Sequence, residues 1–162
     1  MPTYNDGHGY NLNSAAYPAH THTREGIMEV TLDIAAIASA RAAASATALA
    51  IGDVLEAIKL PAQCLVLAIG VEFDGAGDAG LTAAIGDDVD TAGFVAATAA
   101  DAPSNVCSVG TLAAFAAGKY YSAANTIDVL LEGAIPTTGN IRVWAKVVDG
   151  AGPIPVSTSP GT

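Results

Sequence analysis

The chain has 162 residues, which is long enough to bury the core of one ordinary domain. Because 51% of the residues are hydrophobic and only 14% are charged, the composition excludes an intrinsically disordered protein. Sixteen acidic and six basic residues give a formal net charge of −10, which repels phosphate and argues against a nucleic acid partner. No apolar run is long enough to span a bilayer, and the N-terminus lacks the basic start and apolar block of a secretory signal. We therefore expect a soluble protein that binds other proteins and no membrane.

Residues 1–26 show neither the period of a strand nor that of a helix, and they predict an extended N-terminal arm. Fully stretched, such a segment reaches about 80 Å at roughly 3.3 Å per residue. It holds three of the five tyrosines, whose rigid rings suit protein interfaces, although a tail that docks nowhere is the alternative. The residues expected to contact a capsid or another protomer are Tyr4, Tyr10, Tyr17, His20 and His22.

Residues 27–34 alternate between apolar and polar side chains, which predicts a strand with Met28, Val30, Leu32 and Ile34 on one face. The Ala-rich segment 35–50 that follows is ambiguous. Propensity favours a helix there, but its serines and threonine also suit an exposed strand or a loop.

Pro61 is expected near the turn of a strand pair, formed by the segment that begins at Asp53 and the apolar run 64–73. Another short strand is predicted at 81–85, followed by an Asp-rich turn at 86–90 and a loop through Pro103.

Two further strands, 126–131 and 141–148, are predicted to form a hairpin through the turn-rich connector 133–140. In the second of them Ile141, Val143, Ala145 and Val147 alternate with Arg142, Trp144, Lys146 and Val148. Short strands separated by turns predict an all-β fold, an antiparallel β-sandwich or jelly roll, at 27–149. Residues 150–162, with three prolines, are expected to be a C-terminal tail.

No pattern of catalytic residues emerges from the sequence, and we predict neither an enzyme nor a bound cofactor. His20 and His22, with His8, could form a metal site, but no carboxylate cluster or rigid scaffold supports them. Two acidic turns have the oxygen ligands of calcium sites without the EF-hand spacing, so turn capping is the better reading. These turns are Asp74 with Asp78, and Asp87 and Asp88 with Asp90.

The glycines at 75, 77 and 80 match GxGxxG in spacing, but the residues after them predict a strand where a dinucleotide site needs a helix.

Cys64 and Cys107 lack the spacing of a metal or redox motif and are expected to be buried thiols. Three aromatic residues are possible surface contacts with a partner or a carbohydrate, although a place in the sandwich core is common for such side chains. They are Tyr120, Tyr121 and Trp144.

Three stretches of the chain resemble a family of small structural proteins of tailed phages. They are GDVLEAIKLPAQCLVLAIGVEFDGAG, GLTAAIGDDVDTAGFV and KYYSAANTIDVLLEGAIPTTGNIRVWAKVVDG, and the resemblance covers roughly residues 27–149. The matching features are turns and strands, and they include no catalytic signature.

The resemblance implies a virion component, a capsid decoration (cement) protein that folds as a β-sandwich on the outer surface of the head. Its implied partner is the major capsid protein, and it implies a homo-oligomer, a trimer or a dimer. A head-fibre or tail-associated virion protein and a carbohydrate-binding β-sandwich module are the alternatives.

Overall fold

The computed structural model of the protein describes residues 25–74, 79–107, 114–115, 117–135 and 137–149. These parts of the chain form nine strands and one short helix. In chain order the elements are β1 (Glu25–Asp33), α1 (Ile34–Ala43), β2 (Val54–Leu60), β3 (Cys64–Asp74), β4 (Thr82–Gly86), β5 (Val95–Ala99), β6 (Ser104–Cys107), β7 (Lys119–Tyr121), β8 (Asn125–Glu132) and β9 (Asn140–Asp149).

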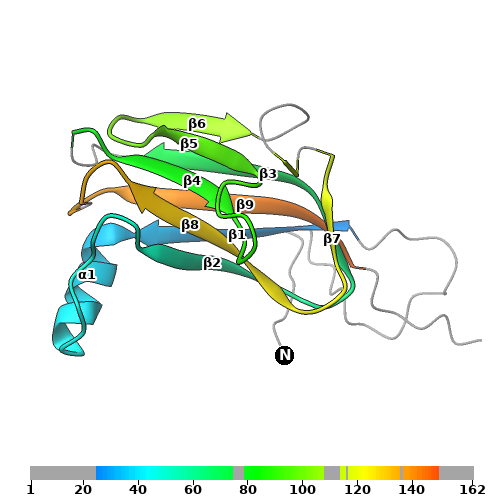
Figure 1. The fold of residues 1–162 in the computed structure, drawn as a ribbon, viewed down its shortest axis with the longest axis horizontal. Coiled ribbons are helices and arrows are strands. Elements are labelled where there is room, and N and C mark those ends of the chain that lie inside the picture. The colour runs from blue at the N-terminus through cyan, green and yellow to red at the C-terminus, as the bar shows by residue number, and fades with distance from the viewer. Residues whose placement is uncertain (1–24, 75–78, 108–113, 116, 136, 150–162) are drawn as a thin grey trace, which may run out of the picture.

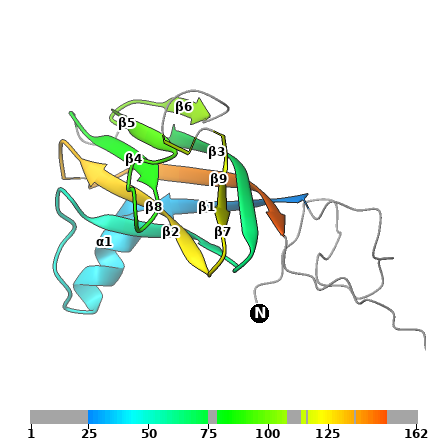
Figure 2. The same ribbon diagram turned by 45° about the vertical axis from the view of Figure 1, so that its right-hand side comes forward.

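The strands form two antiparallel sheets that pack face to face, which confirms the predicted β-sandwich. One sheet has five strands in the order β1-β9-β3-β6, with β7 paired to another part of β3, and the other has four strands in the order β2-β8-β4-β5. The four-stranded sheet lies in front of the five-stranded sheet in Figure 1, and Figure 2 shows the two layers from a second side. The start of β1 and the end of β9 lie at one end of the sandwich, and α1 lies at the other.

The core lies between the sheets and is filled by apolar side chains at every second position of the strands. In β9, Ile141, Val143, Ala145 and Val147 are buried, while Arg142 is exposed on the opposite face, as the alternation predicted. In β1 the predicted inner face packs against the core, and Glu29 and Thr31 are exposed. Cys64 is fully buried, as expected, whereas Cys107 lies in β6 with a side chain outside the described part.

The predicted hairpin is wrong, although both of its segments are strands. β8 lies between β2 and β4 in one sheet, and β9 lies between β1 and β3 in the other, so the connector crosses from sheet to sheet. Alternation decides which face of a strand is buried, but two packed sheets offer the same kind of surface to that face. The pair predicted around Pro61 fails for the same reason, because β2 and β3 belong to different sheets.

The ambiguous Ala-rich segment is partly helical, because α1 covers Ile34–Ala43. The carboxylate of Asp33 caps it by accepting a hydrogen bond from the backbone N–H of Ala36 at 2.9 Å. Ile34, predicted as the last residue of the strand, begins the helix and is 1% exposed. The helix propensity of alanine therefore decides residues 34–43, which include Ser39, whereas Ser45 and Thr47 lie beyond the end of the helix.

Three short strands, β5, β6 and β7, were not predicted from the sequence. β5 lies within the segment that was expected to be a loop, and its residues are small and mostly exposed, so they give no clear alternation. At the N-terminal boundary, Glu25 and Gly26 belong to β1 rather than to the arm. The rest of the arm and the whole C-terminal tail lie outside the described residues.

We expect Val143→Asp to unfold the domain. Val143 is fully buried and lies between Val30 of β1 and Val71 of β3. The new carboxylate would lose its hydration without gaining a charge partner, at a cost of several kcal/mol out of a total stability of about 5–15 kcal/mol. Circular dichroism and thermal unfolding measure the effect.

Thr31→Asp is the matched control, because it places the same charge on the exposed face of the same sheet. It should shift the melting temperature by only a few degrees. A Val143→Asp protein that folds and melts like the parent would mean that the wrong face of β9 has been placed in the core.

Candidate functional site

Of the residues proposed from the sequence as contacts, the structure describes Tyr120, Tyr121 and Trp144. The five arm residues proposed as contacts, Tyr4, Tyr10, Tyr17, His20 and His22, lie outside the described residues. In the described part, no group of three His, Cys, Asp or Glu side chains is placed to hold a metal ion. None of the described helices is both long and apolar enough to cross a membrane.

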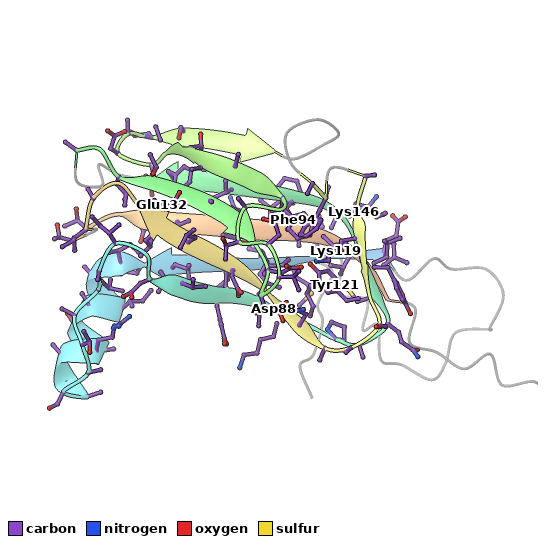
Figure 3. All side chains as sticks on the ribbon, in the orientation of Figure 1. Asp88, Phe94, Lys119, Tyr121, Glu132 and Lys146 are labelled. Atoms are coloured by element: carbon purple, nitrogen blue, oxygen red, sulfur yellow. The ribbon has the colours of Figure 1, made fainter. Side chains whose placement is uncertain are left out.

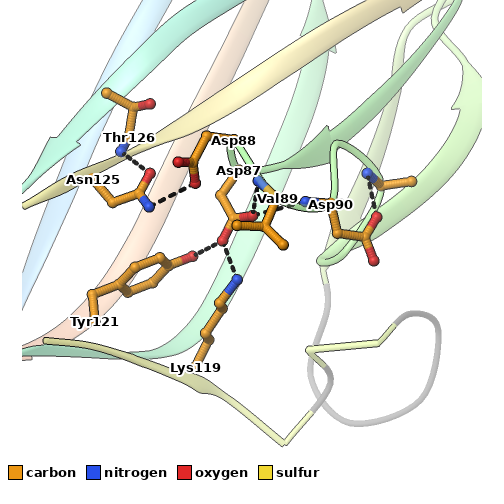
Figure 4. Close-up of polar contacts among 9 residues, drawn as sticks. Asp87, Asp88, Val89, Asp90, Lys119, Tyr121, Asn125 and Thr126 are labelled. Carbon is orange, nitrogen blue, oxygen red and sulfur yellow. Dashed lines mark hydrogen bonds and ion pairs between the residues drawn. The ribbon is translucent and has the colours of Figure 1, made fainter. Parts of the chain in front are cut away.

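Asp87, directly after β4, is a fully buried carboxylate with hydrogen bonds to both oxygens. Its Oδ1 accepts the backbone N–H groups of Val89 and Asp90, each at 3.0 Å, which closes the turn. Its Oδ2 accepts the hydroxyl of Tyr121 at 2.7 Å and pairs with the ammonium group of Lys119 (Figure 4). The prediction that this acidic motif caps a turn is therefore confirmed for Asp87.

Lys119 and its aromatic neighbours extend this polar contact into a cluster (Figure 3). The Lys119 Nζ lies 3.8 Å from the centre of the Phe115 ring, within the range of a cation–π interaction. The Phe115 ring meets Phe94 edge to face, with ring centres 5.0 Å apart. A Cβ atom at Gly93 would collide with Phe115, so glycine is needed there for the loop to lie this close.

The ionisation of this cluster follows from its contacts. Burial alone would raise the pKa of Asp87, but the hydrogen bonds from Lys119, Tyr121 and the turn N–H groups hold that pKa below its usual value. Burial, together with the carboxylate of Asp87, raises the pKa of the Tyr121 hydroxyl. The cluster thus holds a stable ion pair whose carboxylate is engaged, and this arrangement suits a structural link between β7 and the β4–β5 turn.

Tyr121 must be corrected as a surface contact, because it is only 5% exposed and its hydroxyl is used by Asp87. Its neighbour Tyr120 is 59% exposed, since successive residues of a strand point to opposite faces. The two-residue period of β7 therefore leaves Tyr120 exposed and buries Tyr121.

Trp144 and Tyr120 share the outer face of the five-stranded sheet. Trp144 lies on Gly70 of β3, where a Cβ atom would collide with the indole ring. Tyr120 pairs with Leu65 farther along β3. Around Trp144, Arg142 bridges two strands by donating to Glu29 at 2.7 Å and Glu72 at 3.1 Å. This face can offer aromatic rings and paired charges to a partner.

Asp128 is a second buried carboxylate, which was not predicted from the sequence. It lies in the middle of β8, opposite Glu56 and Gly86 on the neighbouring strands, and is 5% exposed. Its Oδ1 has no hydrogen-bond partner. Burial raises its pKa, a hydrogen bond with Thr126 lowers it, and the charges of nearby acidic side chains raise it. A lone acid among the apolar residues TIDVLL was the available sequence signal.

The comparisons with known proteins found similar folds in phage capsids. No protein-family model and no curated protein matches the chain. A chain of the cyanophage Pam1 capsid asymmetric unit is 16% identical with a TM-score of 0.57, and the match covers 92% of this chain and 99% of that one. A chain of the capsid of Ralstonia phage GP4 is 18% identical with a TM-score of 0.57, with 87% and 94% covered. At these identities the likeness establishes a shared fold.

Tyr121→Phe should lower the free energy of unfolding at neutral pH by about 1.5–3 kcal/mol, because a buried carboxylate loses a hydrogen bond. Folding lowers the pKa of Asp87, so its ionisation stabilises the protein above the unfolded value of about 3.9, and this contribution is lost as the pH falls through the folded value. The deficit of the variant should therefore shrink in acid. Urea unfolding at several pH values measures it.

Tyr120→Phe removes the same hydroxyl from the exposed neighbour and should change stability by less than about 0.5 kcal/mol. Equal effects of the two variants would contradict a specific role for the Asp87 contact.

Asp128→Asn should stabilise the protein at neutral pH by about 1–2 kcal/mol, because the amide removes a buried negative charge that lies near other acidic side chains. Folding raises the pKa of Asp128, so its contribution to stability is present below the unfolded value of about 3.9 and is lost as the pH rises through the folded value. The gain from Asn should therefore disappear in acid. Thermal unfolding at pH 3 to 8 measures it.

Glu132→Gln, which removes a charge of the same sign from β8, is the control and should have little effect. If Asp128→Asn were less stable than the parent at pH 7, the carboxylate would have to be satisfied by a group such as a bound cation.

Proposed function

We propose that this chain is a phage capsid decoration (cement) protein, which binds the outer surface of the mature head and stabilises contacts between major capsid protein subunits. The observation that carries the proposal is the shared fold with chains of two phage capsids, each matched over most of its length. The resemblance of three sequence stretches to small tailed-phage structural proteins supports the same role.

The extent of the matches supports a separate, small virion component. The Pam1 match covers 92% of 162 residues, or about 149 residues, and this is 99% of the matched chain. The matched chain is thus about as long as this one and consists of a similar sandwich. A polypeptide of this size fits an added component better than a domain of a large shell subunit.

The described side chains support a structural rather than an enzymatic role. Asp87, the most buried charged group, has both oxygens engaged by the turn, Lys119 and Tyr121. The net charge of −10 disfavours contact with nucleic acid, which suits a position outside the shell. Tyr120 and Trp144 on the outer face of the five-stranded sheet suit a protein interface.

Binding to the assembled shell would stabilise it by mass action. If only the mature lattice presents the complete site, every bound copy shifts the equilibrium toward the intact lattice. Contacts of residues 1–24 with the shell would add to those of the sandwich.

Two other roles remain as candidates. A head-fibre or tail-associated protein would share the fold but would be present in far fewer copies per particle. A carbohydrate-binding module is favoured by one observation, the pair of aromatic residues Tyr120 and Trp144 on a single sheet face.

We expect the purified full-length protein to cosediment with mature capsids that have been stripped of their minor proteins. Binding should saturate at a fixed ratio to the major capsid protein, because each lattice site accepts one decoration unit. A chain without residues 1–24 should bind about tenfold or more weakly, since it loses the arm contacts. Densitometry of the pellets measures the ratio and the apparent affinity.

Saturation at a few copies per particle would indicate a fibre or tail component instead. Absence of binding to capsids, together with retention on a glycan array that Trp144→Ala abolishes, would favour the carbohydrate-binding module. Circular dichroism of the shortened chain is the control for folding.

A further inference from the structure

The contact between Lys119 and Asp87 holds an amine and a carboxyl group together in a largely buried place. Asp87 is fully buried, and the side chain of Lys119 is 23% exposed. The Lys119 Nζ contacts Oδ2 of Asp87 (Figure 4), and the ring centres of Phe115 and Tyr121 lie 3.8 Å and 5.2 Å from Nζ. An amine and a carboxyl group held in contact are the two reactants of an amide bond.

The other lysine–carboxylate pair found among the described residues, Lys146 with Glu25, is open to water. Its two groups lie 3.0 Å apart, and both side chains are 43% exposed. Water hydrates both charges there and can replace the contact, so this pair stays ionic. At Asp87 the aromatic rings and the N–H groups of the turn take the place of that water.

The two oxygens of Asp87 have different partners, and each set suits one part of an amide-forming reaction. Oδ1 accepts the backbone N–H groups of Val89 and Asp90, each at 3.0 Å. Two N–H groups at this distance from one oxygen can stabilise the oxyanion of a tetrahedral intermediate. Oδ2 accepts the hydroxyl of Tyr121 at 2.7 Å and contacts the ammonium group of Lys119, so it has a proton source beside it.

We propose that Lys119 and Asp87 form an intramolecular isopeptide bond, an amide between Nζ and Cγ, with the release of one water molecule. The bond joins β7 of the five-stranded sheet to the turn after β4 of the four-stranded sheet. The ion pair is the starting state of the reaction, and the pH response predicted for Tyr121→Phe belongs to that state. The reaction occurs once per chain, so the protein is its own reactant and needs no substrate.

The atoms balance without any other reactant. The ammonium group of Lys119 first gives one proton to Oδ2, which leaves a neutral amine and a carboxylic acid in contact. The nitrogen then attacks Cγ of Asp87, and Oδ1 becomes the oxyanion held by the N–H groups of Val89 and Asp90. A second proton moves from the nitrogen to Oδ2, the bond between Cγ and Oδ2 breaks, and water leaves. The nitrogen keeps its third proton as the amide N–H.

The burial of the cluster supports these steps. The first proton transfer converts two opposite charges into two neutral groups, which is least costly where water is excluded. The fold holds both reactants in place, and effective concentrations in such intramolecular reactions reach about 10⁵–10⁸ M. Tyr121 is only 5% exposed, and burial raises the pKa of its hydroxyl, so Tyr121 keeps its proton and holds Oδ2 in position.

The first test is the intact mass of the purified full-length protein, measured in denaturant after incubation at neutral pH. We expect a mass below that of the sequence by one water molecule. Trypsin should leave the unfolded chain uncut after Lys119, because the acylated nitrogen no longer carries the charge that trypsin recognises. Tandem mass spectrometry should find Lys119 and Asp87 in one linked peptide. A chain of full mass that trypsin cuts after Lys119 would overturn the proposal.

Lys119→Arg is the matched variant, because arginine keeps the positive charge but its guanidinium group stays protonated and does not attack the carboxyl group. It should keep the full mass. It should also melt about 10 °C or more below the parent, since it lacks a covalent link between residues 32 positions apart. Lys146→Arg, a change in the exposed pair, should lose one water and melt like the parent.

Cyclisation of an Asp–Gly sequence to a succinimide also releases one water, and it must be separated from the proposed bond. The chain contains Asp6-Gly7, Asp74-Gly75 and Asp149-Gly150, and all three are unchanged in Lys119→Arg. Loss of water in both proteins, with no linked peptide in the parent, would assign it to a succinimide and overturn the proposal. If Lys119→Arg fails to fold, the linked peptide and the missing cleavage in the parent still decide. None of these measurements contains capsids, so the outcome is independent of the decoration function.

Discussion

The carboxylate of Asp87 connects the two sheets of the sandwich at one end. It follows β4 of the four-stranded sheet, and its partners Lys119 and Tyr121 belong to β7 of the five-stranded sheet. A fully buried charge is tolerated there because both oxygens are satisfied and an ammonium group lies beside it. The short strand β7 has only three residues, so this contact and its pairing with β3 hold it against the core.

The two buried acids of the domain therefore have opposite effects on its stability at neutral pH. Asp87 is stabilised as an anion by its donors, whereas Asp128 is buried with one oxygen unsatisfied and with other acidic side chains nearby. The two carboxylates differ in stability because different structural elements contact them. A turn supplies N–H groups and β7 supplies a cation to Asp87, while Asp128 in mid-strand lies opposite Glu56 of the neighbouring strand β2.

The sequence predicted the longer strands and their buried faces, because alternation is a local property that β9 and β1 show clearly. It did not predict which strands pair, since β8 and β9 present equally apolar faces to either sheet. It identified the capping role of Asp87 from the acidic turn, but Lys119 is 32 residues away in sequence, and no local pattern links the two. The burial of Tyr121 rather than Tyr120 likewise depends on the register of β7 with β3.

The strand that continues from the arm is well placed to bear a load. β1 pairs with β9 at nine consecutive positions, and β9 pairs in turn with β3 along most of its length. Hydrogen bonds in an antiparallel pair are perpendicular to the strands, so a pull on Glu25 along the strand axis loads all of them together rather than one after another. Contact of residues 1–24 with another protein would pass its load into β1, and the Asp87 contact couples the second sheet to the same end of the sandwich. A protein proposed to hold shell subunits together requires this kind of resistance.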